Sequence, residues 1–147
     1  GHSVYVIDGD VRVVVTGDID LSTFGPYYGD AVSSLDDFEA TLAMVRDLRA
    51  DHYVTFHHKG VIDGHAEFAS LVDVYSAVFA RREQSLLDLL DVPRSFDELV
   101  AEGIVYRAGT RPPVFGESVE RRSIEQHLER VVSNGLVTTD GERFRRS

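Results

Sequence analysis

The valine-rich run Val11 to Val15 is the feature that most constrains what this chain can fold into. Its side chains are apolar on both faces of a strand, apart from Arg12, so this strand should be buried in a larger sheet. The run Val4 to Ile7 precedes it, and Asp8-Gly9-Asp10 between the two runs favours a tight turn. The sequence therefore predicts a β-hairpin that begins a larger sheet.

A helix and a further strand are expected after this hairpin. Residues 20–33 are rich in glycine and aromatics, and a loop that follows a strand end commonly lines a site. Within it, Tyr27 and Tyr28 either wall a substrate pocket or pack on the nearest helix. From Ser34 a capping residue, an acidic first turn and apolar residues at helical spacing predict a helix. Residues 53–56 then predict a short strand, and the order strand, helix, strand indicates an α/β fold.

The second part of the chain predicts helices followed by a hairpin. Ser95 with Glu98 is a capping box for a short helix, and Gly135 can take the left-handed conformation that ends a helix. The expected elements are a long helix over 66–90, a short helix from Ser95, a loop over 107–113, a helix over 118–134 and a hairpin over 136–144. Helix, helix and hairpin in this order are typical of a winged helix-turn-helix.

The composition limits the available chemistry. The 147 residues include no cysteine, which excludes disulfides, thiolate ligands and a cysteine nucleophile, so any metal must be held by histidine and carboxylate. No window approaches the ~18 to 20 unbroken apolar residues of a membrane span, and no N-terminal segment of secretory type is present. We therefore expect a soluble, cytoplasmic protein with no membrane contact.

Charge is unevenly distributed along the chain. Residues 1–78 contain four basic and thirteen acidic residues, whereas residues 79–147 contain eleven and twelve. This difference predicts two units with these limits. The acidic first part suits cation binding better than contact with the phosphates of nucleic acid.

Two segments at predicted strand ends carry the residues that point to chemistry. Asp18 and Asp20 follow the valine-rich strand, and His57 and His58 follow the next one. An aspartate and a histidine at strand ends are typical of a metal-centred hydrolase site. Taken alone, Asp18 could instead cap a turn, His58 could be a surface histidine, and Asp20 could either orient a ligand or be a solvated loop acid.

The same residues resemble a known family. Ser3 to Ile62 resembles the C-terminal half of a metallo-β-lactamase-fold hydrolase, and Phe79 to Arg146 resembles the winged-helix tail of the β-lactamase-like 2 branch of that superfamily. Gly17-Asp18 matches the bridging aspartate motif, and His57-His58-Lys59-Gly60-Val61-Ile62 aligns with the family's Gly-His-Gly-Pro-Val-Ile segment. The resemblance implies an α/β fold: the C-terminal half of an αββα sandwich over 1–78, followed by a small winged-helix domain over 79–147.

The resemblance also implies a metal-dependent hydrolase, in which a metal-activated water attacks an ester, thioester, lactam or phosphodiester of a small-molecule substrate. Asp18 would be the catalytic carboxylate that bridges two zinc ions, and His58 would be a metal ligand. His57 would be the ligand if the alignment slips by one residue. Manganese or iron could stand in place of zinc.

The upstream motif of the superfamily, His-x-His-x-Asp-His, is absent from the chain. His2 stands sixteen residues before Asp18, closer than the family pattern places its third-motif histidine, and Gly-His-Ser is also the kind of remnant that tag cleavage leaves. We therefore expect the N-terminal half of the hydrolase, carrying that motif, as a partner, and an inactive chain without it. A homodimer is the other arrangement that would cover the sheet of the first part.

The predicted tail raises a different function, nucleic-acid binding. Arginines fall on its second helix and hairpin, from which a winged helix contacts phosphates: Arg121, Arg122, Arg130, Arg143, Arg145 and Arg146. Glu120, Glu125 and Glu129 interleave with them, as on a salt-bridged solvated helix. We expect a dimerisation or substrate-covering element, with RNA contact allowed because some relatives with this tail are endoribonucleases. A winged-helix nucleic-acid-binding or dimerisation module is the alternative function.

Overall fold

The structure, a computed structural model, describes residues 3–106 and 109–147. The first of its two units combines the described residues up to Pro26 with Asp37–Phe79, and the second combines Tyr27–Asp36 with Ala80–Ser147. The segment 27–36 thus belongs to the second unit although both of its flanks belong to the first. The domain limits 1–78 and 79–147 stay a prediction. His2 and the first two residues of the predicted loop over 107–113 lie outside the described residues.

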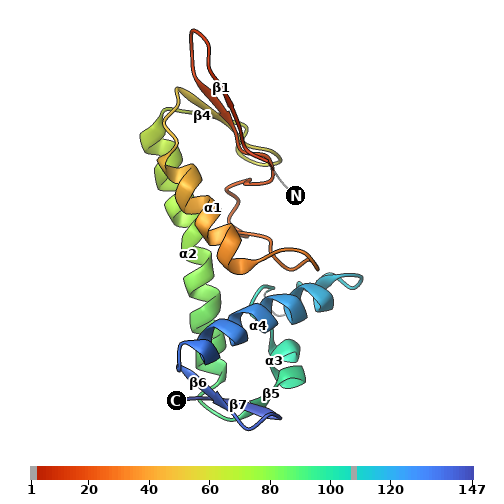
Figure 1. The fold of residues 1–147 in the computed structure, drawn as a ribbon. Helices are drawn as coiled ribbons and strands as arrows, with labels where there is room; N and C mark the ends of the chain where they lie inside the picture. Colours follow the sequence, from red (N-terminus) through yellow and green to blue (C-terminus); the bar gives the residue numbers. More distant parts are fainter. Residues whose placement is uncertain (1–2, 107–108) are drawn as a thin grey trace. The chain divides into compact units, whose positions relative to one another are not determined.

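Four short strands form the sheet of the first unit. They are β1 (Tyr5–Ile7), β2 (Val13–Val15), β3 (His52–Val54) and β4 (Val61–Asp63), in the order β1-β2-β3-β4. β1 and β2 form the predicted antiparallel hairpin (Figure 1), and β4 returns antiparallel to β3. β2 and β3 are parallel, which the intervening helix α1 (Leu35–Asp47) makes possible, because parallel neighbours need a crossover connection.

One face of this sheet is covered. Val14, Tyr53 and Ile62 are aligned across three strands and are buried. The Tyr53 ring stacks on Phe68 of α2 (His65–Leu89), with ring centroids 3.8 Å apart. The core of the first unit therefore lies between this face and the helices.

The opposite face is uncovered among the described residues of the unit. Tyr5, Val15, Val54 and Val61 are in register across all four strands. Tyr5 and Val61 are each 62% exposed, and the two central valines are only half-buried. The prediction that the valine-rich strand is buried therefore holds for one face, through Val14, and is wrong for the other.

The second unit combines helices with a three-stranded sheet. After α2 come β5 (Arg94–Ser95), α3 (Phe96–Glu102), α4 (Gly116–Ser133), β6 (Val137–Thr139) and β7 (Arg143–Arg146), with the strands in the order β5-β7-β6 (Figure 1). Its apolar core draws side chains from α2 and the residue after it, from α3, from α4 and from β6, namely Leu86, Leu90, Leu99, Ile124, Leu128, Val131 and Val137. The predicted helices and hairpin are confirmed.

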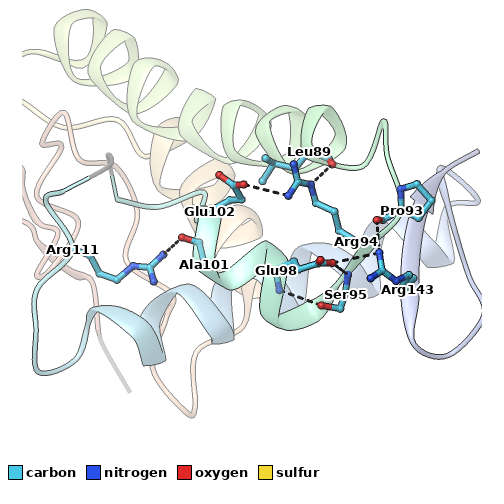
Figure 2. Close-up of polar contacts among 9 residues, drawn as sticks. All are labelled: Leu89, Pro93, Arg94, Ser95, Glu98, Ala101, Glu102, Arg111 and Arg143. Carbon is cyan, nitrogen blue, oxygen red and sulfur yellow. Dashed lines mark hydrogen bonds and ion pairs between the residues drawn. The ribbon is translucent and has the colours of Figure 1, made fainter.

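The predicted capping box begins α3. Ser95 Oγ accepts from Glu98 N at 3.2 Å, and Glu98 Oε2 accepts from Ser95 N at 2.7 Å. Figure 2 shows that Arg143 of β7 reaches the same carboxylate and donates to the Pro93 carbonyl. One local sequence signal thus both starts the helix and ties it to the last strand.

Glu120 corrects one prediction, because it does not lie on a solvated helix face. It is fully buried, and its carboxylate accepts hydrogen bonds from the backbone N–H groups of Ile104, Val105 and Tyr106 at 2.8 to 3.2 Å. Gly103 has φ 78°, and a Cβ there would lie 2.7 Å from Glu120 Oε1. The carboxylate therefore fixes the backbone that follows α3.

Helix α4 holds the segment 27–36 through buried polar contacts. Gln126 donates to the Tyr28 carbonyl at 3.0 Å and accepts from Leu35 N at 2.6 Å. The Tyr28 hydroxyl lies 2.9 Å from Nε2 of His127. Burial, reinforced by Arg130 and Arg82, lowers the pKa of His127 to about 3. His127 is therefore neutral in the folded protein at neutral pH.

Replacing Glu120 should destabilise the chain. Glu120→Gln removes the charge that three backbone donors share and should lower the free energy of unfolding by about 2 kcal/mol, with a larger loss for Glu120→Ala. Urea denaturation followed by circular dichroism measures both. Glu125→Gln is the matched control, because Glu125 is an exposed partner of Arg122 on the same helix, and its effect should stay within about 0.5 kcal/mol. Equal effects for positions 120 and 125 would contradict the assignment.

Acid should weaken the fold through His127. In the unfolded chain this side chain has a pKa near ~6.5, whereas in the folded chain the pKa is about 3. The contribution of neutral His127 to the free energy of unfolding is therefore fully present above pH ~6.5 and is lost as the pH falls from there toward 3. The slope from this group is at most about 1.4 kcal/mol per pH unit. Urea midpoints at pH 7.5, 6.5 and 5.5 measure it. His127→Gln should flatten the slope, and an unchanged slope in this variant would refute the prediction.

Candidate functional site

The parallel pairing of β2 with β3 brings the two predicted site segments to one edge of the sheet. Both strands end at this edge, at Val15 and Val54. Thr16 N donates to the Val54 carbonyl at 2.9 Å, and Phe56 N donates to the Gly17 carbonyl at 3.3 Å. The segments that carry the aspartates and the histidines are therefore joined by backbone hydrogen bonds.

The structure pairs each histidine with one aspartate. His57 Nε2 lies 3.9 Å from Asp18 Oδ1, and His58 Nε2 lies 3.6 Å from Asp20 Oδ2. The Asp18 side chain is 74% exposed and that of Asp20 only 18%, and Asp20 Oδ1 accepts from Ser22 N at 3.0 Å. Asp20 is thus the anchored carboxylate and Asp18 the accessible one.

The histidines stand at the tip of the β3–β4 hairpin. Thr55 N donates to the Gly60 carbonyl at 2.8 Å, which closes the loop, and His58 N donates to the Phe56 carbonyl at 2.9 Å. His57 adopts φ 70°, an uncommon conformation for a residue other than glycine. The tip therefore presents Phe56, His57, His58 and Lys59 to solvent. The sequence interpretation treated Lys59 only as part of a motif.

Carboxylate oxygen and imidazole nitrogen are the donor types that zinc and related metals accept. A zinc site needs three or four protein donors, and the described part of the chain contains no group of three or more histidine and acidic side chains placed to hold a metal. Asp18 and His58 thus fit a metal in chemistry but do not complete a site. The assignment of both as ligands stays a prediction.

The two tyrosines of the loop have separate environments. Tyr28 is buried against His127, with Arg82 Cζ 5.2 Å from its ring centroid, so it packs in the second unit. Tyr27 is exposed. The packing alternative therefore holds for Tyr28.

Most arginines of the second unit that were candidates for phosphate contact are engaged by acids. The ion pairs are Arg121 with Asp97 and Glu117, Arg122 with Glu125, Arg130 with Asp36, Arg143 with Glu98, and Arg146 with Asp88 and Asp91. Phosphate binding depends on cations whose charge is available to the ligand. This surface therefore offers little uncompensated positive charge. None of the helices in the described residues has the length and apolar character to cross a membrane.

Comparison with solved structures identifies the fold. A metallo-β-lactamase family protein from Thermus thermophilus matches 100% of this chain and 50% of its own, with a TM-score of 0.66 and 23% identity. A β-lactamase domain protein from Burkholderia ambifaria matches 99% of this chain and 48% of its own, with a TM-score of 0.62 and 16% identity. The chain has the fold of part of a metallo-β-lactamase protein. It spans about half the length of both solved relatives.

Sequence comparison is less informative. No family model matches the chain. A curated tRNA-2-methylthio-N(6)-dimethylallyladenosine synthase from Chlorobium phaeovibrioides (strain DSM 265 / 1930) is 32% identical over 105 residues, which cover 71% of this chain and 22% of that enzyme. The chain thus spans about a fifth of the length of that relative.

Proposed function

We propose that this chain is part of a metal-dependent hydrolase with the metallo-β-lactamase fold, in which water attacks an ester, thioester, lactam or phosphodiester bond. The supporting observation is the placement of Asp18, Asp20, His57 and His58 on two joined segments at the carboxyl edge of β2 and β3. Such an edge is where loops of a sheet commonly carry function. The likeness to the solved structures supports the fold part of the proposal.

Each residue of the edge has a role in this proposal. Asp18, exposed and negatively charged, is the catalytic carboxylate and a metal ligand, and His58 is a second ligand. Asp20, held by Ser22 N, faces His58 Nε2 and orients its ring, as partners of metal ligands commonly do. A bound divalent ion would supply an acidic water, with a pKa near ~7. Zinc suits these donors, with manganese or iron as alternatives.

The remaining ligands would come from residues outside these 147. The His-x-His-x-Asp-His motif is absent from the sequence, and each solved relative is about twice as long as the part this chain matches. The uncovered face with Tyr5, Val15, Val54 and Val61 supports the same partner, because an apolar sheet face of this kind is normally packed. We propose that the N-terminal half of the hydrolase covers it with a second sheet. A homodimer that covers the same face is the competing arrangement.

The second unit would form a winged helix. The order of α3, α4 and the hairpin β6–β7, with β5 paired to β7, supports this. Because most of its arginines are paired with acids, the unit is better suited to dimerisation or to covering a substrate than to holding nucleic acid. Retention of RNA at low salt that weakens steeply with added salt would reverse this preference.

The first measurement is the intact mass of the protein as the cell makes it, dissolved without separation. A longer polypeptide, or a second one carrying His-x-His-x-Asp-His, is the expected result, and substrates of the four bond classes would then be screened on the complete protein. A homogeneous 147-residue chain with full hydrolytic activity would overturn the proposed partner.

Asp18→Asn in the complete protein should reduce the rate of hydrolysis by at least about a hundredfold, because a metal ligand and its charge are lost. The same variant should bind less metal, as measured by elemental mass spectrometry. His58→Gln should do the same and His57→Gln should not. Asp10→Asn, in the turn between β1 and β2, is the matched control. Wild-type turnover and metal content in Asp18→Asn would contradict the site assignment. Loss of turnover and metal in His57→Gln but not in His58→Gln would identify His57 as the ligand.

A further inference from the structure

The tip of the β3–β4 hairpin carries a cation that the proposed metal site does not use. Lys59 is the chain's one lysine, and all fourteen other basic residues are arginines. It is exposed, like the three residues before it. It directly follows His58 in a loop closed by the Thr55–Gly60 hydrogen bond. A flexible positive charge therefore stands beside the proposed ligand.

The Lys59 ammonium has no ion pair within 4 Å in the described part of the chain. The two acids of the facing segment, Asp18 and Asp20, lie beside the imidazoles instead. Arg46 of the same unit, by contrast, pairs with both Asp73 and Asp47. The positive charge of Lys59 is thus available to a ligand.

The chemistry of lysine narrows what that ligand can be. An ammonium is a compact charge with three donors on a flexible stem, and it binds carboxylate or phosphate without the fixed bidentate geometry that arginine imposes. A polyanion would be repelled by the excess of acidic residues in the first unit. One anionic group within reach of Lys59 would meet an available cation at the hairpin tip.

We propose that Lys59 is a specificity-determining residue of the hydrolase, whose ammonium binds one carboxylate or phosphate group that the substrate carries away from the bond to be cleaved. This inference rests on the proposed function and narrows its substrate class. The substrates are small molecules that combine a hydrolysable bond with one such anionic group.

The test uses matched substrates of the bond class that the complete protein hydrolyses. One compound is neutral beyond the scissile bond, one carries an added carboxylate and one an added phosphate. Wild type should prefer at least one anionic compound. Lys59→Ala should lower the ratio of kcat/KM for that compound to kcat/KM for the neutral one by about three- to tenfold, mainly through KM, since the lost interaction is a binding contact. Lys59→Arg should restore most of the ratio, and Lys59→Glu should lower it further.

Arg49→Ala is the control, because Arg49 is an exposed cation of the same unit between α1 and β3. The ratio of kcat/KM for the anionic compound to kcat/KM for the neutral compound should be the same in Arg49→Ala as in wild type. The two anionic compounds separate a carboxylate from a phosphate as the natural group. Hydrolysis with the same ratio in wild type and Lys59→Ala would overturn this inference and leave the proposed function standing. Hydrolysis of no compound in any bond class would overturn both.

A second readout does not depend on turnover. An acetylating reagent modifies lysine amines, and peptide mass mapping reports modification at Lys59 separately from any other amine. The anionic product, at saturating concentration, should slow acetylation of Lys59 several-fold relative to the neutral product. Equal rates with the two products would contradict binding at this ammonium.

Discussion

The parallel pairing of β2 with β3 is the constraint on which the first unit depends. Its register aligns Val14 with Tyr53 on the covered face and Val15 with Val54 on the uncovered one. A shift of one residue would exchange these faces, because side chains alternate along a strand. The same pairing places two loop segments at one edge and joins them through the carbonyls of Val54 and Gly17. The buried core of the sheet and the candidate site thus both depend on this one strand pairing.

The second unit depends on buried polar groups that hold irregular backbone. The Glu120 carboxylate accepts hydrogen bonds from the backbone of the three residues that follow Gly103. Gln126 holds the segment 27–36 by hydrogen bonds at two points. Buried backbone N–H and carbonyl groups are costly without partners, and no regular element supplies them here. Both side chains lie on α4, so one helix serves as apolar core on one side and as a hydrogen-bonding scaffold on another.

Local signals in the sequence predicted much of this fold. The turn Asp8-Gly9-Asp10, the Ser95–Glu98 box and Gly135 each act within a few residues, and each is found where it was expected.

β4 was missed, because three residues after a loop give no periodicity to read. Glu120 was misassigned for a different reason. Its charged neighbours at helical spacing indicate a solvated face, whereas contacts with residues distant in sequence, the backbone at 104–106 and Arg111, make its burial favourable. The candidate site shows the same division. Asp18 and His58 could be selected from their positions after strands only together with the family resemblance, whereas the pairing of each histidine with its aspartate depends on the conformation of the hairpin tip.

The proposed N-terminal half would account for two features of the first unit. The apolar face of the sheet lacks cover among the residues the structure describes. The same residues contain no group of three or more histidine and acidic side chains placed to hold a metal, whereas a zinc site needs three or four donors. A segment that packed on Tyr5, Val15, Val54 and Val61 would begin at the face and could extend past the ends of β2 and β3 to the edge. The hydrophobic burial would then stabilise the arrangement of ligands, because at about 25 cal/mol per Å² even a modest buried area exceeds the cost of ordering a few side chains. Folding and metal binding would therefore be coupled through a single interface.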